Sequence, residues 1–294
     1  MPATDSILVI LDKPKHAQVA LQRAAALARA DNAHLQLVSF CFLPMATNRE
    51  VFDTHQRRAL KKSVMQERRR WLDGLVRDRQ LAAADISTEI VWTDDIAGWV
   101  ADRAGAAARL VVKTVHHSKT LLHTPLDWAL LRQCPVPLLL VSSAHPAQAG
   151  IVLAAVDAAA ATARRRRLDE KVVQAGRWLV GLTGSKLHVV SVVEVQGGFE
   201  DLEYFDTRKA HDKARRLAAE RVGELLAGQK VAQNRLHLPF GKVGQAVAEV
   251  AEQVQADTVV VGTGTRRGIG ARLLGTSAEK ILQRAACDVL AVHL

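Results

Sequence analysis

The chain has 294 residues, of which 49% are apolar and 24% are charged, and this length suggests about two globular domains. Three cysteines without a CxxC pair exclude a disulfide scaffold, and no apolar run reaches the roughly 18 residues of a membrane span. The net charge of +10 is shared equally, since residues 1–147 hold 19 Lys and Arg against 14 Asp and Glu, and residues 148–294 hold 21 against 16. Such an even charge favours anions in general and does not select nucleic acid. Without a basic flank before an apolar N-terminal segment, we expect no secretory signal and a cytoplasmic location.

In chain order, the first half alternates short apolar runs with segments of helical periodicity. The apolar runs predict strands near residues 6–11, 35–42, 86–92, 110–115 and 137–141, with helices between them. The second half gives the same alternation. Its predicted strands are at about 150–156, 187–194, 234–239, 258–262 and 288–292, and its predicted helices are at about 168–183, 207–227, 243–255 and 276–285.

The two halves also resemble each other in sequence. The offset between matching positions is 145 residues at Asp12 and Asp157, and 153 residues at Cys134 and Cys287. A nearly constant offset along the chain indicates a tandem duplication. We therefore predict one domain over residues 1–145 and a second over residues 149–294.

Alternating strands and helices predict the α/β class, with two tandem open parallel five-stranded sheets and helices on both faces of each sheet, a Rossmann-like arrangement. Ligands of such sheets bind beyond the carboxyl ends of the strands, where the strand order reverses. In the second half, this rule directs attention to the segments that begin at Asp157 and Gly262.

The segment after the fourth predicted strand of the second half is rich in glycine. Residues 262–277 read GTGTRRGIGARLLGTS. Glycines let backbone amides approach a polyanion, arginines supply positive charge, and the predicted helix start adds free N–H groups. The segment therefore predicts a phosphate-binding loop, with a glycine-rich turn and an ordinary helix cap as the alternative. Neither GxxxxGK[ST] nor a complete GxGxxG is present.

This loop resembles the signature of the universal stress protein family, G-x2-G-x9-G-[ST]. Gly262, Gly275 and Thr276 match the signature, whereas Thr265 stands at its second glycine, with Gly264 beside it. The resemblance covers both halves and is closest to the tandem members of the family. It implies a fold of the adenine nucleotide α-hydrolase type and a ligand that is ATP or another adenine nucleotide, optionally with magnesium.

The resemblance also implies roles for individual residues. Asp157 would contact the ribose–adenine part of the nucleotide, Val192 would line the adenine pocket, and Gly262 and Thr263 would lie along the nucleotide. The remaining candidate nucleotide-binding residues belong to the glycine-rich loop and the following helix start: Gly264, Thr265, Arg266, Gly275, Thr276 and Ser277. We predict no catalytic residue and no metal ligand.

The first half does not repeat the phosphate-binding loop. Its matching segment, residues 112–125, contains no glycine, and Pro125 removes an amide donor at the next helix start. His116, His117, His123 and Asp127 have the ligand chemistry of zinc, but adjacent histidines usually point apart, so a metal site is not favoured.

A second group of charges is the arginine run at residues 164–167. We place it between the first strand and the first helix of the second half. Its expected role is that of a solvated surface, with an anionic ligand as the less favoured alternative.

The sequence thus predicts a regulatory stress-response protein with one adenine-nucleotide site, in its second half. Slow ATP hydrolysis or phosphoryl transfer is the alternative, although no base is evident. Nucleic-acid binding is less favoured because no known module is present. We also expect the halves to pack as an intrachain pseudo-dimer, because duplicated domains often keep a two-fold contact. A further homodimer and an unknown regulatory protein are the other expected partners, and no membrane contact is expected.

Overall fold

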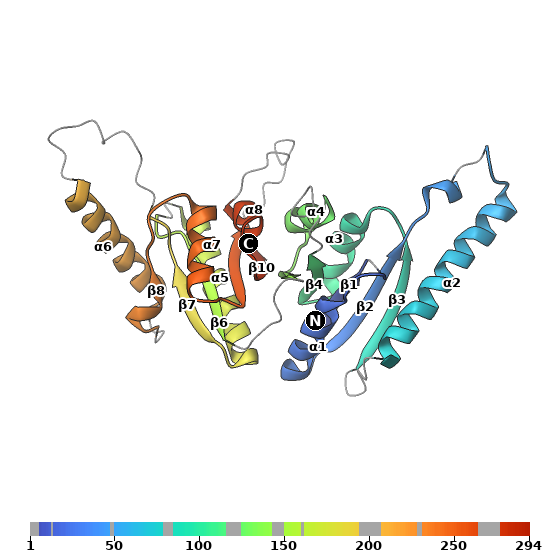
Figure 1. Cartoon of the computed structure of the whole chain (residues 1–294), viewed down its shortest axis with the longest axis horizontal. Coiled ribbons are helices and arrows are strands. Elements are labelled where there is room, and N and C mark those ends of the chain that lie inside the picture. Colours follow the sequence, from blue (N-terminus) through green and yellow to red (C-terminus); the bar gives the residue numbers. More distant parts are fainter. Residues whose placement is uncertain are drawn as a thin grey trace. The chain divides into compact units, whose positions relative to one another are not determined.

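The computed structural model describes residues 6–12, 14–47, 50–78, 85–115, 125–142, 150–159, 162–193, 207–227, 231–263 and 277–294. These residues form two compact units, the first within residues 6–142 and the second within residues 150–294. Each unit consists of a parallel sheet and the helices that cover it (Figure 1).

The first unit alternates strands and helices through its whole length. Its elements are β1 (Ser6–Leu11), α1 (Val19–Asp31), β2 (His34–Cys41), the 3-10 helix η1 (Pro44–Thr47), α2 (Thr54–Asp78), β3 (Ile86–Trp92), α3 (Ile96–Ala107), β4 (Leu110–Val115), α4 (Pro125–Gln133) and β5 (Leu138–Ser142). The strand order is β3-β2-β1-β4-β5, and every pair is parallel.

The second unit repeats this topology. Its elements are β6 (Ile151–Ala155), α5 (Ala163–Thr183), β7 (Lys186–Val190), α6 (Thr207–Leu225), the 3-10 helix η2 (Gln233–Arg235), β8 (Leu236–His237), α7 (Val243–Gln253), β9 (Thr258–Thr263), α8 (Ser277–Leu282) and β10 (Asp288–His293). The strand order is β8-β7-β6-β9-β10, again with parallel pairs.

The core of each unit lies at its central strands. All residues of β1 and β4 are buried, and so are all residues of β9 except Gly262, because helices cover both faces of a parallel sheet. In the first unit, α2 and α3 lie on opposite sides of β2 and β3 (Figure 1). Right-handed crossovers produce this division, since the chain first runs outward from β1 to β3 and then crosses back to β4.

The structure confirms the predicted fold class, and all ten strands lie at or within a few residues of their predicted positions. The main difference concerns α5, which begins at Ala163, five residues before the predicted start. The Thr162 hydroxyl caps it by accepting a hydrogen bond of 3.3 Å from the Arg165 amide. The arginine run at residues 164–167 therefore lies in the first turns of α5, and its placement before the helix was wrong. None of the described helices combines the length and the apolarity needed to cross a bilayer.

Candidate functional site

The strand order of the second unit reverses at β6. The chain runs outward through β7 and β8, then returns to place β9 on the other side of β6. Ala155 pairs with Val261, so Asp157, two residues beyond Ala155, comes at the carboxyl end where β9 reaches Gly262 and Thr263. Three predicted site residues therefore follow or end the two strands at the switch point.

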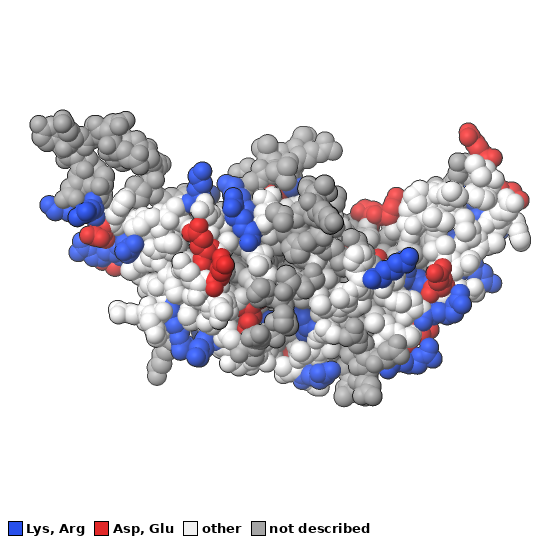
Figure 2. All heavy atoms as spheres, in the orientation of Figure 1, with Lys and Arg blue, Asp and Glu red and all other residues white. Residues whose placement is uncertain are grey.

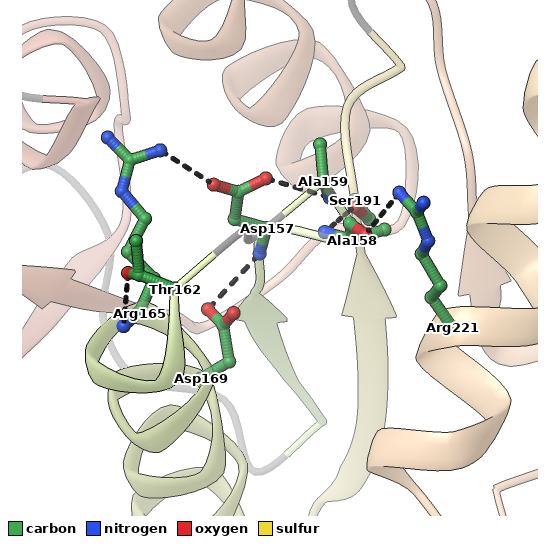
Figure 3. A network of polar contacts seen from close by, with 8 residues as sticks. All are labelled: Asp157, Ala158, Ala159, Thr162, Arg165, Asp169, Ser191 and Arg221. Carbon is green, nitrogen blue, oxygen red and sulfur yellow. Dashed lines mark hydrogen bonds and ion pairs between the residues drawn. The ribbon is translucent and has the colours of Figure 1, made fainter.

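The turn that contains Asp157 is held by hydrogen bonds from three directions (Figure 3). The Asp157 amide donates to Oδ1 of Asp169 at 3.1 Å, and the Ala158 amide donates to the Ser191 hydroxyl at 2.9 Å. The Ala159 amide donates to Oδ1 of Asp157 itself at 3.0 Å, which makes a local aspartate turn. These three successive amides are thus committed to protein acceptors.

The carboxylate of Asp157 remains accessible. Its side chain is 47% exposed, and it forms an ion pair of 3.6 Å with the Arg165 guanidinium, on a side chain that is 68% exposed. An exposed ion pair of this length contributes little, about 0–1 kcal/mol. A ligand hydroxyl could therefore take the place of Arg165 at small cost. On the other side of the turn, Arg221 of α6 donates to the Ala158 carbonyl at 3.3 Å (Figure 3).

Asp169 of α5 is a site residue that the sequence reasoning missed. It is only 8% exposed, and burial, with the nearby Asp157 carboxylate adding to the effect, raises its pKa from 3.8 to about 7. A signal was present in the sequence, since Asp169 precedes the apolar positions Val172 and Val173 by three and four residues. That spacing places a carboxylate on the buried face of the helix.

The two β9 residues of the site are closely packed. A Cβ atom at Gly262 would lie 2.6 Å from Cγ of Leu168, so α5 itself requires a glycine here. Thr263 is 5% exposed, and its hydroxyl donates to the Val292 carbonyl at 3.2 Å. His293 contacts the same hydroxyl through Nδ1, and burial, together with the Lys171 charge, lowers the pKa of His293 to about 4. The Thr263 side chain is therefore engaged with β10.

The remaining predicted residues divide into two groups. Val192 is half-buried just after β7, and Ser277 is the exposed first residue of α8, close to the predicted helix start. Five predicted residues lie outside the described part of the chain: Gly264, Thr265, Arg266, Gly275 and Thr276.

At the corresponding place, the first unit is built differently. Asp12 follows β1 as Asp157 follows β6, and Ile10 pairs with Lys113 where Ala155 pairs with Val261. Lys113 thus takes the place of an apolar residue, although it is 0% exposed.

Three oxygen atoms of the first unit lie close to the Lys113 ammonium. Its Nζ lies 2.9 Å from the Thr114 carbonyl, 2.9 Å from Oδ1 of Asp127 and 3.2 Å from Oδ2 of Asp12. The contact with the Thr114 carbonyl is a hydrogen bond, and those with the two carboxylates are ion pairs. Asp12, the counterpart of Asp157, is consequently tied to an internal cation.

In this arrangement the Asp127 carboxylate, one of the four groups considered as metal ligands in the first half, pairs with Lys113. Asp127 is 0% exposed and paired with Lys113, and the three neighbouring histidines, His116, His117 and His123, lie outside the described residues. Among the residues that the structure describes, no group of three or more His, Cys, Asp or Glu could hold a metal ion.

Comparison with known proteins identifies this pair of units. The model of the universal stress protein family matches the chain twice, over residues 4–142 and 151–293. The chain belongs to the universal stress protein family. It carries two domains of this family in tandem, which confirms the resemblance seen in the sequence.

Relatives within the family align along almost the whole chain. Universal stress protein E of Escherichia coli (strain K12) is 27% identical over 304 residues, covering 99% of this chain and 95% of that protein. The universal stress protein E homolog of Haemophilus influenzae is 24% identical over 301 residues, covering 98% of this chain and 96% of that protein.

Solved structures agree on the fold. The crystal structure of a putative universal stress protein from Pseudomonas aeruginosa UCBPP-PA14 is 24% identical with a TM-score of 0.73, and covers 99% of this chain and 94% of that one. A universal stress protein from Archaeoglobus fulgidus DSM 4304 is 15% identical with a TM-score of 0.67, and covers 99% of this chain and 98% of that one.

Proposed function

We propose that the second unit binds ATP or a related adenine nucleotide, and that this protein acts in the stress response as a regulatory nucleotide-binding protein. The observation that carries the proposal is the accessible Asp157 carboxylate at the switch point, next to Gly262, where the glycine-rich segment begins. A carboxylate there accepts hydrogen bonds from ligand hydroxyls, and the glycine-rich segment supplies backbone amides and arginines for phosphate.

The differences between the first and the second unit support one nucleotide per chain. In the first unit, the equivalent carboxylate of Asp12 is held by the buried Lys113, and residues 112–125 contain no glycine. A nucleotide there would find neither a free carboxylate nor backbone amides without side chains. We therefore expect a stoichiometry of one.

Magnesium has a weaker basis than the nucleotide. The described carboxylates at the second switch point are Asp157, which faces solvent, and Asp169, which is buried and accepts the Asp157 amide. These two do not converge on one point, so a magnesium ion would be held chiefly by the phosphates of the nucleotide. When bound, the ion would neutralise phosphate charge.

Titration calorimetry of the full chain with ATP and with AMP tests the proposal. Asp157→Ala should weaken binding by at least about tenfold, because a hydrogen bond to a charged group contributes roughly 1.5–3 kcal/mol. Asp212→Ala is the matched control, because it removes another exposed carboxylate of the second unit, from α6. Two nucleotides per chain, or equal affinities of wild type and Asp157→Ala, would contradict the proposal.

The alternatives predicted from the sequence are separated by two further measurements. Release of inorganic phosphate from ATP would indicate hydrolysis. Salt-sensitive retention of DNA would indicate nucleic-acid binding, which we do not favour because basic and acidic side chains are interspersed on both units in the view of Figure 2, with no continuous basic stripe over the described residues there.

A further inference from the structure

The first helix of the second unit is longer than its counterpart, and the extra length lies at one end. Helix α5 has 21 residues, whereas α1 has 13. Both end in the same way, on a left-handed residue two positions before the next strand: Asn32 (φ 48°) after α1 and Gly184 (φ 69°) after α5. The eight additional residues are therefore the first two turns of α5, residues 163–170.

These two turns make the contacts that shape the candidate site. Arg165 faces the Asp157 carboxylate, Leu168 packs over Gly262, and Asp169 accepts the Asp157 amide. Figure 3 shows the Asp169 carboxylate directed from α5 toward the Asp157 backbone. The first unit lacks this extension.

The position of Asp169 is costly for the fold. A carboxyl group that is 8% exposed loses most of its hydration, and burial is the largest cause of its raised pKa. A helix that only needed to cover the sheet would be better served by an apolar residue at this place. At this place the Asp169 carboxylate accepts the hydrogen bond from the Asp157 amide, which belongs to the candidate site.

That hydrogen bond restrains Asp157 from its backbone side. The Asp157 amide is held by Asp169, and the Asp157 carboxylate is held by the Ala159 amide. With the Asp157 amide and Oδ1 both held, the other carboxylate oxygen, Oδ2, faces Arg165, and the side chain is 47% exposed to solvent. Preorganisation of this kind reduces the conformational entropy that the protein loses when a ligand binds.

We propose that Asp169 is a positioning residue of the adenine-nucleotide site, which holds the Asp157 turn in the orientation that the ligand meets. This inference rests on the proposed function, because it concerns the same site. Asp169 acts through Asp157 and does not itself touch the nucleotide.

The first test compares three variants of the full chain by calorimetry with ATP. Asp169→Ala removes the acceptor and should weaken binding by about tenfold, whereas Asp169→Asn keeps an oxygen acceptor of the same shape and should stay within about threefold of wild type. Glu170→Ala is the matched control, because it removes the exposed carboxylate next in sequence and should leave affinity within about twofold.

The second test needs no nucleotide. Amide hydrogen exchange of Asp157 in the ligand-free protein should become at least about tenfold faster in Asp169→Ala and should stay close to wild type in Asp169→Asn. If wild type binds no nucleotide, the proposed function fails, while the exchange measurement still reports on positioning. Unchanged exchange in Asp169→Ala, wild-type affinity in that variant, or an equal loss of affinity in Asp169→Asn would overturn the inference.

Discussion

Lys113→Met should strongly destabilise the first unit. Methionine keeps the length of the side chain and removes its charge, so the variant isolates the ion pairs. The Lys113 and Asp127 side chains are both 0% exposed and that of Asp12 is 12% exposed, so two carboxylates would share a buried place without their cation. Breaking a buried ion pair by removing one partner costs about 3–5 kcal/mol. We expect the free energy of unfolding of the first unit to fall by about this amount.

Urea unfolding followed by tryptophan fluorescence measures this effect. Four of the five tryptophans lie in the first half, so the signal reports mainly on that unit: Trp71, Trp92, Trp99 and Trp128. Lys62→Met is the matched control, because Lys62 is an exposed lysine of α2 in the same unit. Substitution of an exposed residue should change the free energy of unfolding by no more than about 0.5 kcal/mol.

A double variant separates the charge effect from packing. Lys113→Met together with Asp127→Leu removes the fully buried carboxylate as well as its cation, and should recover part of the lost stability. The reasoning is refuted if Lys113→Met unfolds within about 1 kcal/mol of wild type, or if the double variant is less stable than Lys113→Met alone.

Three further predictions concern the second unit and the pairing of the units. Gly262→Ala should destabilise the second unit by about 1–3 kcal/mol in urea unfolding, and Leu168→Ala should relieve this cost, because the new Cβ would lie 2.6 Å from Leu168. Because the pKa of Asp169 is raised in the folded state to about 7, its stabilising contribution is complete below about pH 4 and is lost as pH rises through 7. The free energy of unfolding of Asp169→Asn should not show this decline. Above pH 7 it should exceed that of wild type by on the order of 1–3 kcal/mol. The pseudo-dimer stays a prediction, and solution scattering that shows two lobes of variable spacing would contradict it.

Much of the fold could be predicted because the apolar runs of a parallel sheet are continuous. Strand boundaries were less predictable where the apolar pattern outlasts the strand. Strand β7 ends at Val190, although the sequence predicts strand to residue 194. The prediction was not arbitrary, since the amides of Ser191 and Val193 still donate to the carbonyls of His237 and Pro239. The predicted start of α5 is five residues too late because four consecutive arginines are typical of a solvated segment before a helix, whereas Thr162 caps the helix before them.

The candidate site was predictable only where it depends on topology. The switch-point rule located Asp157 and Gly262, because it follows from strand order. It gave no information on Ser191 or Arg221, which reach the Asp157 turn from other elements. Gly262 illustrates a second limit, because the sequence suggested close approach of phosphate, and the structure adds a packing reason through Leu168.

The two switch points differ in what a ligand must displace, and this difference supports the proposal that the nucleotide binds to the second unit. A ligand hydroxyl that bonds a carboxylate gains about 1.5–3 kcal/mol. At Asp157 it displaces an exposed arginine 3.6 Å away, a pair that contributes about 0–1 kcal/mol, so a net gain remains. At Asp12 it must take an oxygen from the buried Lys113, and loss of a partner from such a pair costs about 3–5 kcal/mol. The cost then equals or exceeds the gain. The buried lysine thus holds the Asp12 carboxylate inside the first unit, whereas the Asp157 carboxylate of the second unit is half-exposed, as the proposed nucleotide site requires.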